Sequence, residues 1–105
     1  MKRGVEMYFI TTLRICGNIV DDCRTIGMKN SYAGCYYDIA SNACDMFEDG
    51  YYQYAFISAI DEGLYPNVTE QQWFKFIREE KNGITGVAIC DRPAEIGDYK
   101  PYIIG

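Results

Sequence analysis

The chain has 105 residues, of which 49% are hydrophobic, and this is enough for one compact domain but too little for two. It carries 15 acidic and 10 basic residues, a net charge of −5, so its overall field repels the phosphate backbone of nucleic acids. We therefore expect residues 1–105 to form a single domain that does not bind nucleic acid, with residues 1–6 as a loose N-terminal extension.

The first residues, MKRGVEMYFITTLRICG, have the basic start of a secretory signal but lack its continuous apolar stretch, because Glu6 and Arg14 interrupt it. Charged or polar residues also interrupt every window of about twenty residues that spanning a bilayer would require. These patterns predict a soluble, cytoplasmic protein without a membrane partner.

The first half of the chain predicts two strands and a helix. In residues 7–15 the side chains follow a period of two and are rich in β-branched residues, which predicts a strand. After the turn dipeptide Gly17-Asn18, residues 23–29 can run back beside it as a hairpin partner. Apolar residues then recur three or four positions apart, which predicts a helix of about four turns, capped by Asn30 or Ser31 and stopped at Asp49-Gly50. Its expected apolar face comprises Tyr32, Tyr36, Ile39, Ala40, Ala43 and Phe47.

The second half predicts three more strands. Residues 51–60, YYQYAFISAI, have no polar face, which is typical of a central strand, and their alternation places Tyr52, Tyr54 and Phe56 on one side. Residues 71–77 and 84–90 should pair through Asn82-Gly83, and one helical turn is expected at 93–96. The resulting order, ββαβββ, predicts an α+β fold: an antiparallel sheet of about five strands with one main helix over one face.

Catalytic motifs are scarce in this sequence. Histidine, the most frequent general acid or base, is missing, and no cysteine pair has the two-residue spacing of a zinc knuckle. Asp61 and Glu62 are adjacent, so in a strand they would point in different directions, which weakens a catalytic or metal-binding pair. We expect no enzymatic activity, no metal and no cofactor.

The cysteines and the acidic pairs have ordinary interpretations. Cys16, Cys35, Cys44 and Cys90 lie in apolar patterns and are expected to be small buried hydrophobic residues, whereas the neighbouring carboxylates make Cys23 a poor nucleophile. The recurrent acidic pairs could suggest a DNA mimic, but their position near predicted turns favours solvated loop ends. These pairs are Asp21-Asp22, Glu48-Asp49, Asp61-Glu62 and Glu79-Glu80.

One helix covers only part of one face of such a sheet, so the other face needs a second cover. Two interpretations remain open: its aromatic residues fill a second small core beneath the C-terminal tail, or they form a surface that binds a protein partner. An exposed face of this kind would also favour a homo-oligomer. The candidate partner-binding residues are Trp73, Tyr65, Tyr51, Lys75 and Glu62.

A small-ligand sponge is the alternative function, with an enzyme of unfamiliar chemistry as a third. In the sponge, tyrosine rings would stack on a signalling nucleotide and arginines would neutralise its phosphate, although the net negative charge disfavours this. The candidate ligand-binding residues are Tyr52, Tyr54, Arg24 and Arg92.

The segments LRICGN, RTIG, EDGYYQYAFISAIDEGLYP, WFKF and CDRPAEI…IIG together resemble a group of small uncharacterised proteins from gut Firmicutes, their phages and other mobile elements. The resemblance covers most of the chain from Met7 onward, and the group has no established activity or site residues. It implies a phage or mobile-element protein that acts by binding, most concretely an inhibitor that binds a host protein of a bacterial defence system.

Overall fold

The computed structural model describes residues 6–46, 52–61, 67–79 and 83–97. It has the predicted order ββαβββ and forms a single compact α+β domain. The elements are β1 (Glu6–Cys16), β2 (Ile19–Lys29), α1 (Tyr32–Met46), β3 (Tyr54–Asp61), β4 (Asn67–Glu79), β5 (Gly83–Cys90) and the short 3-10 helix η1 (Ala94–Ile96).

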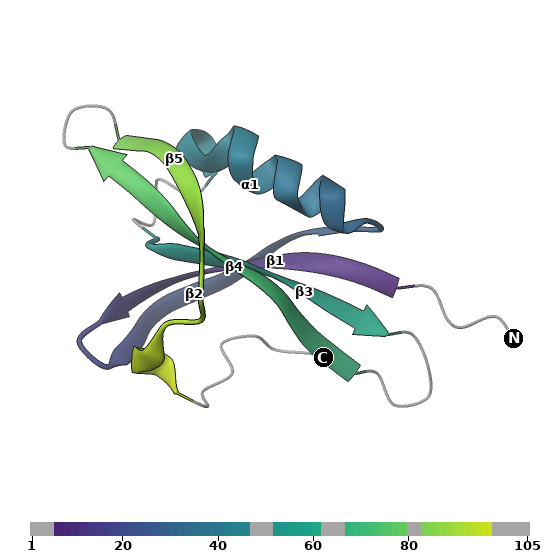
Figure 1. The fold of residues 1–105 in the computed structure, drawn as a ribbon, viewed down its shortest axis with the longest axis horizontal. Helices are drawn as coiled ribbons and strands as arrows, with labels where there is room; N and C mark the ends of the chain where they lie inside the picture. The colour runs from purple at the N-terminus through teal and green to yellow at the C-terminus, as the bar shows by residue number, and fades with distance from the viewer. Residues whose placement is uncertain (1–5, 47–51, 62–66, 80–82, 98–105) are drawn as a thin grey trace, which may run out of the picture.

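The five strands form one antiparallel sheet in the order β2-β1-β3-β4-β5. The sheet is strongly twisted, with α1 on one side and η1 on the other (Figure 1). We call the side that contacts α1 the helix face and the opposite side the far face. Strand β3 is central, as its lack of a polar side predicted, and β2 and β5 are the two edges.

The β1–β2 hairpin turns at Gly17, whose φ of 67° lies in the region that favours glycine. Strand β2 begins at Ile19, four residues before the predicted start. The prediction missed these residues because Asp21 and Asp22 interrupt the alternation of apolar and polar side chains. Asp21 is therefore in a strand and not at a loop end, and its Oδ2 atom lies 2.8 Å from Arg14 Nη2 on β1.

Helix α1 is capped by Ser31, one of the two predicted caps, whose Oγ accepts a 3.1 Å hydrogen bond from the Gly34 amide. The prediction of its buried side was partly wrong. Cys35 and Ile39 are fully buried, whereas Tyr36 is 44% exposed and Ala40 is also exposed. Tyr36 lies at the flank of the buried stripe, where its ring packs against Phe74.

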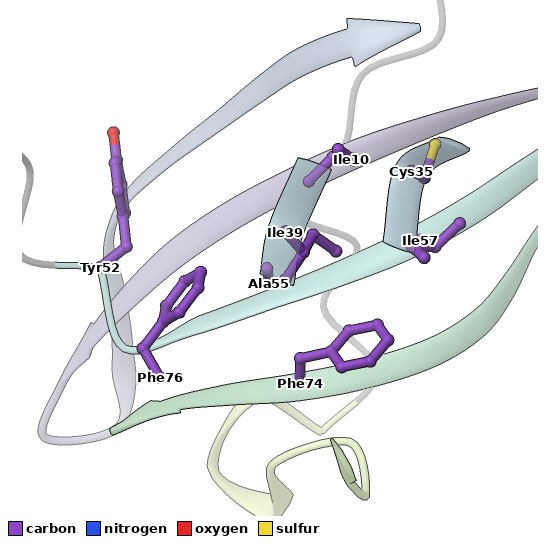
Figure 2. Packing of buried hydrophobic residues seen from close by; sticks show 8 residues of the cluster. All are labelled: Ile10, Cys35, Ile39, Tyr52, Ala55, Ile57, Phe74 and Phe76. Atoms are coloured by element: carbon purple, nitrogen blue, oxygen red, sulfur yellow. The ribbon is translucent and has the colours of Figure 1, made fainter. Parts of the chain in front are cut away.

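The main hydrophobic core lies between α1 and the helix face. Figure 2 shows Cys35 and Ile39 of the helix in one group with Ile10 of β1 and Ile57 of β3. Side chains from β4 extend this core toward the β5 edge, where Val87 packs against it. The buried members are Ile10, Cys35, Ile39, Tyr52, Ala55, Ile57, Phe74 and Phe76.

A second, smaller core lies on the far face and contains Leu13, Phe56, Trp73 and Ile96. Tyr54 packs against this second core, whereas Tyr52 belongs to the first. The expectation that both tyrosines share one side is wrong, because β3 begins only at Tyr54 and the regular alternation does not extend back to Tyr52.

Replacing Ile57 with alanine should lower the free energy of unfolding by about 3 kcal/mol, because the side chain is fully buried in the central strand. The matched variant is Ile19→Ala, whose isoleucine is 70% exposed and should contribute less than about 1 kcal/mol. Urea denaturation followed by circular dichroism measures both. Equal losses in the two variants would contradict this assignment of the core.

Candidate functional site

The candidate partner-binding residues do not form one exposed surface in the described part of the chain. Tyr51, Glu62 and Tyr65 lie outside the described residues, and Lys75 is exposed on β4. Of the two interpretations left open for Trp73, a displayed binding surface is wrong, because only 4% of the residue is exposed.

Trp73 is buried because aromatic neighbours enclose its ring on the far face. It stacks on Phe56 with ring centroids 4.2 Å apart and an interplanar angle of 24°. Tyr54 meets it edge-on at 6.3 Å, and Nε1 of Trp73 donates a 3.0 Å hydrogen bond to Oε1 of Glu70. With its polar atom bonded within the chain, Trp73 serves as a core residue.

Arg92 supplies the outer cover of this second core. Its guanidinium lies 5.6 Å from the centre of the Trp73 ring and forms an ion pair with Glu70 through Nη1. Its Nε also donates a 3.1 Å hydrogen bond to the Gly97 carbonyl, which ties the end of η1 to β4. The far face thus follows the interpretation of a second small core beneath a C-terminal segment, here residues 91–97.

The candidate ligand-binding residues fall into two separate places. Arg24 lies 5.9 Å from the ring centre of Tyr52, which is 1% exposed and donates a 3.3 Å hydrogen bond to Asp22. Tyr54 and Arg92 belong to the second core instead. The Tyr52 ring is buried and Arg92 is already paired with Glu70, so this arrangement does not present a stacking platform beside a phosphate-binding cation.

One hollow of about 240 Å³ lies between the β1–β2 turn and η1. Its described lining consists of Asn18, Ile19, Val20 and Ile96, so only Asn18 contributes a polar side chain. This lining offers apolar contact but few of the convergent polar groups that orient a small ligand.

The cysteines agree only in part with the sequence analysis. Cys35 is buried as expected, but Cys16 is exposed, because it ends β1 at the hairpin turn. Cys23 is exposed and Cys90 is half-buried, while the side chain of Cys44 lies outside the description. Among the described residues, no group of three or more histidine, cysteine, aspartate or glutamate side chains could hold a metal ion.

The outer face of α1 is the surface that sequence reasoning missed. Every exposed residue between positions 32 and 41 is tyrosine, alanine or serine, and none is charged. Solvent-facing helix surfaces normally carry charged residues, and 24% of this chain is charged. Composition offered one signal, since the segment YAGCYYDIAS contains a single charged residue. We define the α1 outer face as Tyr32, Ala33, Tyr36, Tyr37, Ala40 and Ser41.

Two tyrosines of this face are held in place by the sheet. Tyr32 meets Tyr8 of β1 edge-on with ring centroids 6.3 Å apart, and Tyr36 leans on Phe74 of β4 at 5.7 Å. Tyr37, which is 68% exposed, points away from the buried stripe of Cys35 and Ile39. Rings that are already positioned lose little conformational entropy when a partner covers them.

The single charge among residues 32–41 is neutralised at one flank of α1. Asp38 Oδ2 lies 3.1 Å from Lys29 Nζ of β2, so the helix is anchored to the sheet on the side away from Tyr36. Burial, together with the neighbouring Tyr36, raises the pKa of Tyr32, so its hydroxyl is a neutral hydrogen-bond donor at physiological pH. The face can therefore provide apolar contact and hydroxyl donors without desolvating a charge.

Comparison with protein-family models, with curated proteins and with solved structures finds no match to this chain. Within the described ranges, no helix has the length and apolar content needed to cross a membrane.

The fluorescence of Trp73, the single tryptophan of the chain, should report its burial. We expect emission at shorter wavelength than that of free tryptophan and weak quenching by iodide. Replacing Arg92 with alanine removes the cation over the ring and the link to Gly97, and should shift the emission to longer wavelength and increase quenching. Emission of the unaltered protein like that of free tryptophan would contradict the second core.

Burial and the nearby Asp38 raise the pKa of the Cys35 thiol from its ordinary 9.0 to about 11, with Lys29 opposing the shift. Since the folded state favours the protonated thiol, this contribution to stability is complete below pH 9.0 and is lost as the pH rises toward about 11. The free energy of unfolding of the unaltered protein should therefore fall more steeply across this interval than that of Cys35→Ala. Parallel slopes in urea denaturation of the two proteins would contradict the burial of this thiol.

Proposed function

We propose that this protein is a non-catalytic binding protein that contacts a protein partner through the α1 outer face. The observation that carries the proposal is that every exposed position from 32 to 41 is uncharged, with tyrosines at three of them. Solvent alone places no such restriction on an exposed helix surface. Tyrosine is enriched in protein interfaces because it combines apolar area with a hydroxyl and has few rotatable bonds.

The small residues between the tyrosines favour a closely packed contact. Ala33 and Ala40 are exposed on the same side as Tyr37, so a partner backbone or helix can approach between the rings. The matching partner surface is apolar, with hydrogen-bond acceptors opposite the tyrosine hydroxyls. Since the chain has a net charge of −5, a partner with a basic rim would associate faster.

In its most specific form, the proposed partner is a host protein of a bacterial defence system, which the bound chain would inhibit by covering a working surface. This form rests on the resemblance to proteins of phages and mobile elements. The general proposal, binding of a protein through the α1 outer face, rests on the geometry and can hold for another partner.

Replacing Tyr37 with alanine should weaken partner binding about thirtyfold, since truncating a central interface tyrosine costs about 2 kcal/mol. Ala40→Glu should weaken it further by placing a charge in the contact. The matched control is Ala94→Glu, which makes the same substitution at an exposed alanine of η1.

All four proteins would be immobilised and exposed to lysate from a gut Firmicutes bacterium, with retained proteins quantified by mass spectrometry. A partner is a protein retained by the unaltered chain and by Ala94→Glu but lost from the two α1 variants. Its dissociation constants would then be measured by calorimetry with purified components. Equal affinity for all four folded proteins would contradict this placement of the binding surface.

A further inference from the structure

The two edges of the sheet differ in how they are protected against pairing with another strand. Edge strand β2 carries Asp21, Asp22, Arg24 and Lys29, and charges of this kind prevent another strand from adding to an edge. Edge strand β5, with the sequence GITGVAIC, carries no charged residue and no proline. The β5 edge thus lacks the usual sequence protection.

The direction of one hydrogen bond shows which β5 backbone groups face outward. The Phe76 amide donates a 2.9 Å hydrogen bond to the Gln53 carbonyl, so this part of Phe76 points toward β3 and away from β5. Backbone groups alternate in direction along an antiparallel strand, and Phe76 is opposite Val87 while Phe74 is opposite Ile89. The amides and carbonyls of Val87 and Ile89 therefore point away from β4, toward the outer edge of the described sheet.

The side chains at this edge are apolar and partly uncovered. Ile89 is 67% exposed, and Val87 is half-buried against the main core. Both lie on the helix face, because their register partners Phe74 and Phe76 belong to the core on that side. An added strand would gain backbone hydrogen bonds and cover Ile89 at the same time.

We propose that two copies of this chain pair antiparallel through β5 and form one continuous sheet across a two-fold axis. The outward backbone groups of one copy must pair with the outward backbone groups of the other. We therefore align Val87 of each copy opposite Ile89 of the other, which brings these apolar side chains together on the helix face. This alignment places Ala88 on the axis, opposite its own counterpart. Each Val87–Ile89 pair exchanges both of its backbone hydrogen bonds.

A second copy fits this edge better than an unrelated charged segment, because the contact is symmetric and brings no charged residue of β5 against another. The charged β2 edge cannot pair in the same way, so assembly closes at two chains and does not continue into a fibre. Each copy carries a net charge of −5, so added salt should strengthen the dimer by screening the repulsion. The inference does not depend on the proposed α1 contact, since it uses a different surface.

Sedimentation equilibrium of the full chain should show a monomer–dimer equilibrium. Ile89→Glu should raise the dimer dissociation constant about tenfold or more, because it places a charge opposite Val87 twice in each dimer. Ile19→Glu is the matched control: its isoleucine is 70% exposed on the other edge strand, and it makes the same charge change without affecting the dimer. A monomer at every concentration and salt level, or equal effects of the two variants, would overturn the proposal.

A disulfide test checks the alignment without weakening the contact. In a Cys90→Ser background, Ala88→Cys puts a thiol beside its own counterpart in a pair whose Cα atoms should be about 4.5 Å apart, which suits a disulfide. Mild oxidation should produce a covalent dimer linked through position 88, identified by peptide mass spectrometry. The exposed thiols of Cys16 and Cys23 report random collisions, and linkage through them instead of position 88 would overturn the alignment.

Discussion

The fold depends on covering the central strand β3 on both sides. Ala55, Phe56 and Ile57 are consecutive and fully buried, yet neighbouring residues of a strand point to opposite faces. No single layer can bury all three, so the sheet needs a cover on each side. Helix α1 provides one cover and the segment that contains η1 provides the other.

Each cover is fixed by packing together with an ion pair at its margin. Asp38 joins α1 to Lys29 of β2, and Arg92 joins the η1 segment to Glu70 of β4. Both pairs are partly solvated, so their direct contribution is modest, and the buried aromatic and aliphatic contacts contribute most of the stability. Helix α1 contacts β5 as well as the inner strands, yet Ile89 of β5 remains 67% exposed.

The sequence was sufficient to predict the order of the elements along the chain, ββαβββ, and the central position of β3, because alternation and turn residues are local signals. It left open whether Trp73 is buried or displayed, since the cover comes from residues 91–97, whose irregular pattern does not indicate where they pack. The prediction of which side of α1 is buried was also partly wrong. Tyr32 and Tyr36 repeat with the same spacing as Cys35 and Ile39, so periodicity alone cannot decide which stripe meets the sheet.

Two exposed surfaces, the α1 outer face and the β5 edge, carry no charged residue, although packing would allow charge at both. A buried position excludes charge by desolvation, but the α1 outer face and the β5 edge are exposed and could accept lysine or glutamate at little cost. Charge is present on the other edge strand, β2, which carries Asp21, Asp22, Arg24 and Lys29. Two separate uncharged surfaces, a helix face with rigid tyrosines and a strand edge with outward backbone groups, suit two different contacts. The two proposals therefore use different surfaces of one chain: β5 for a second copy and the α1 outer face for another protein.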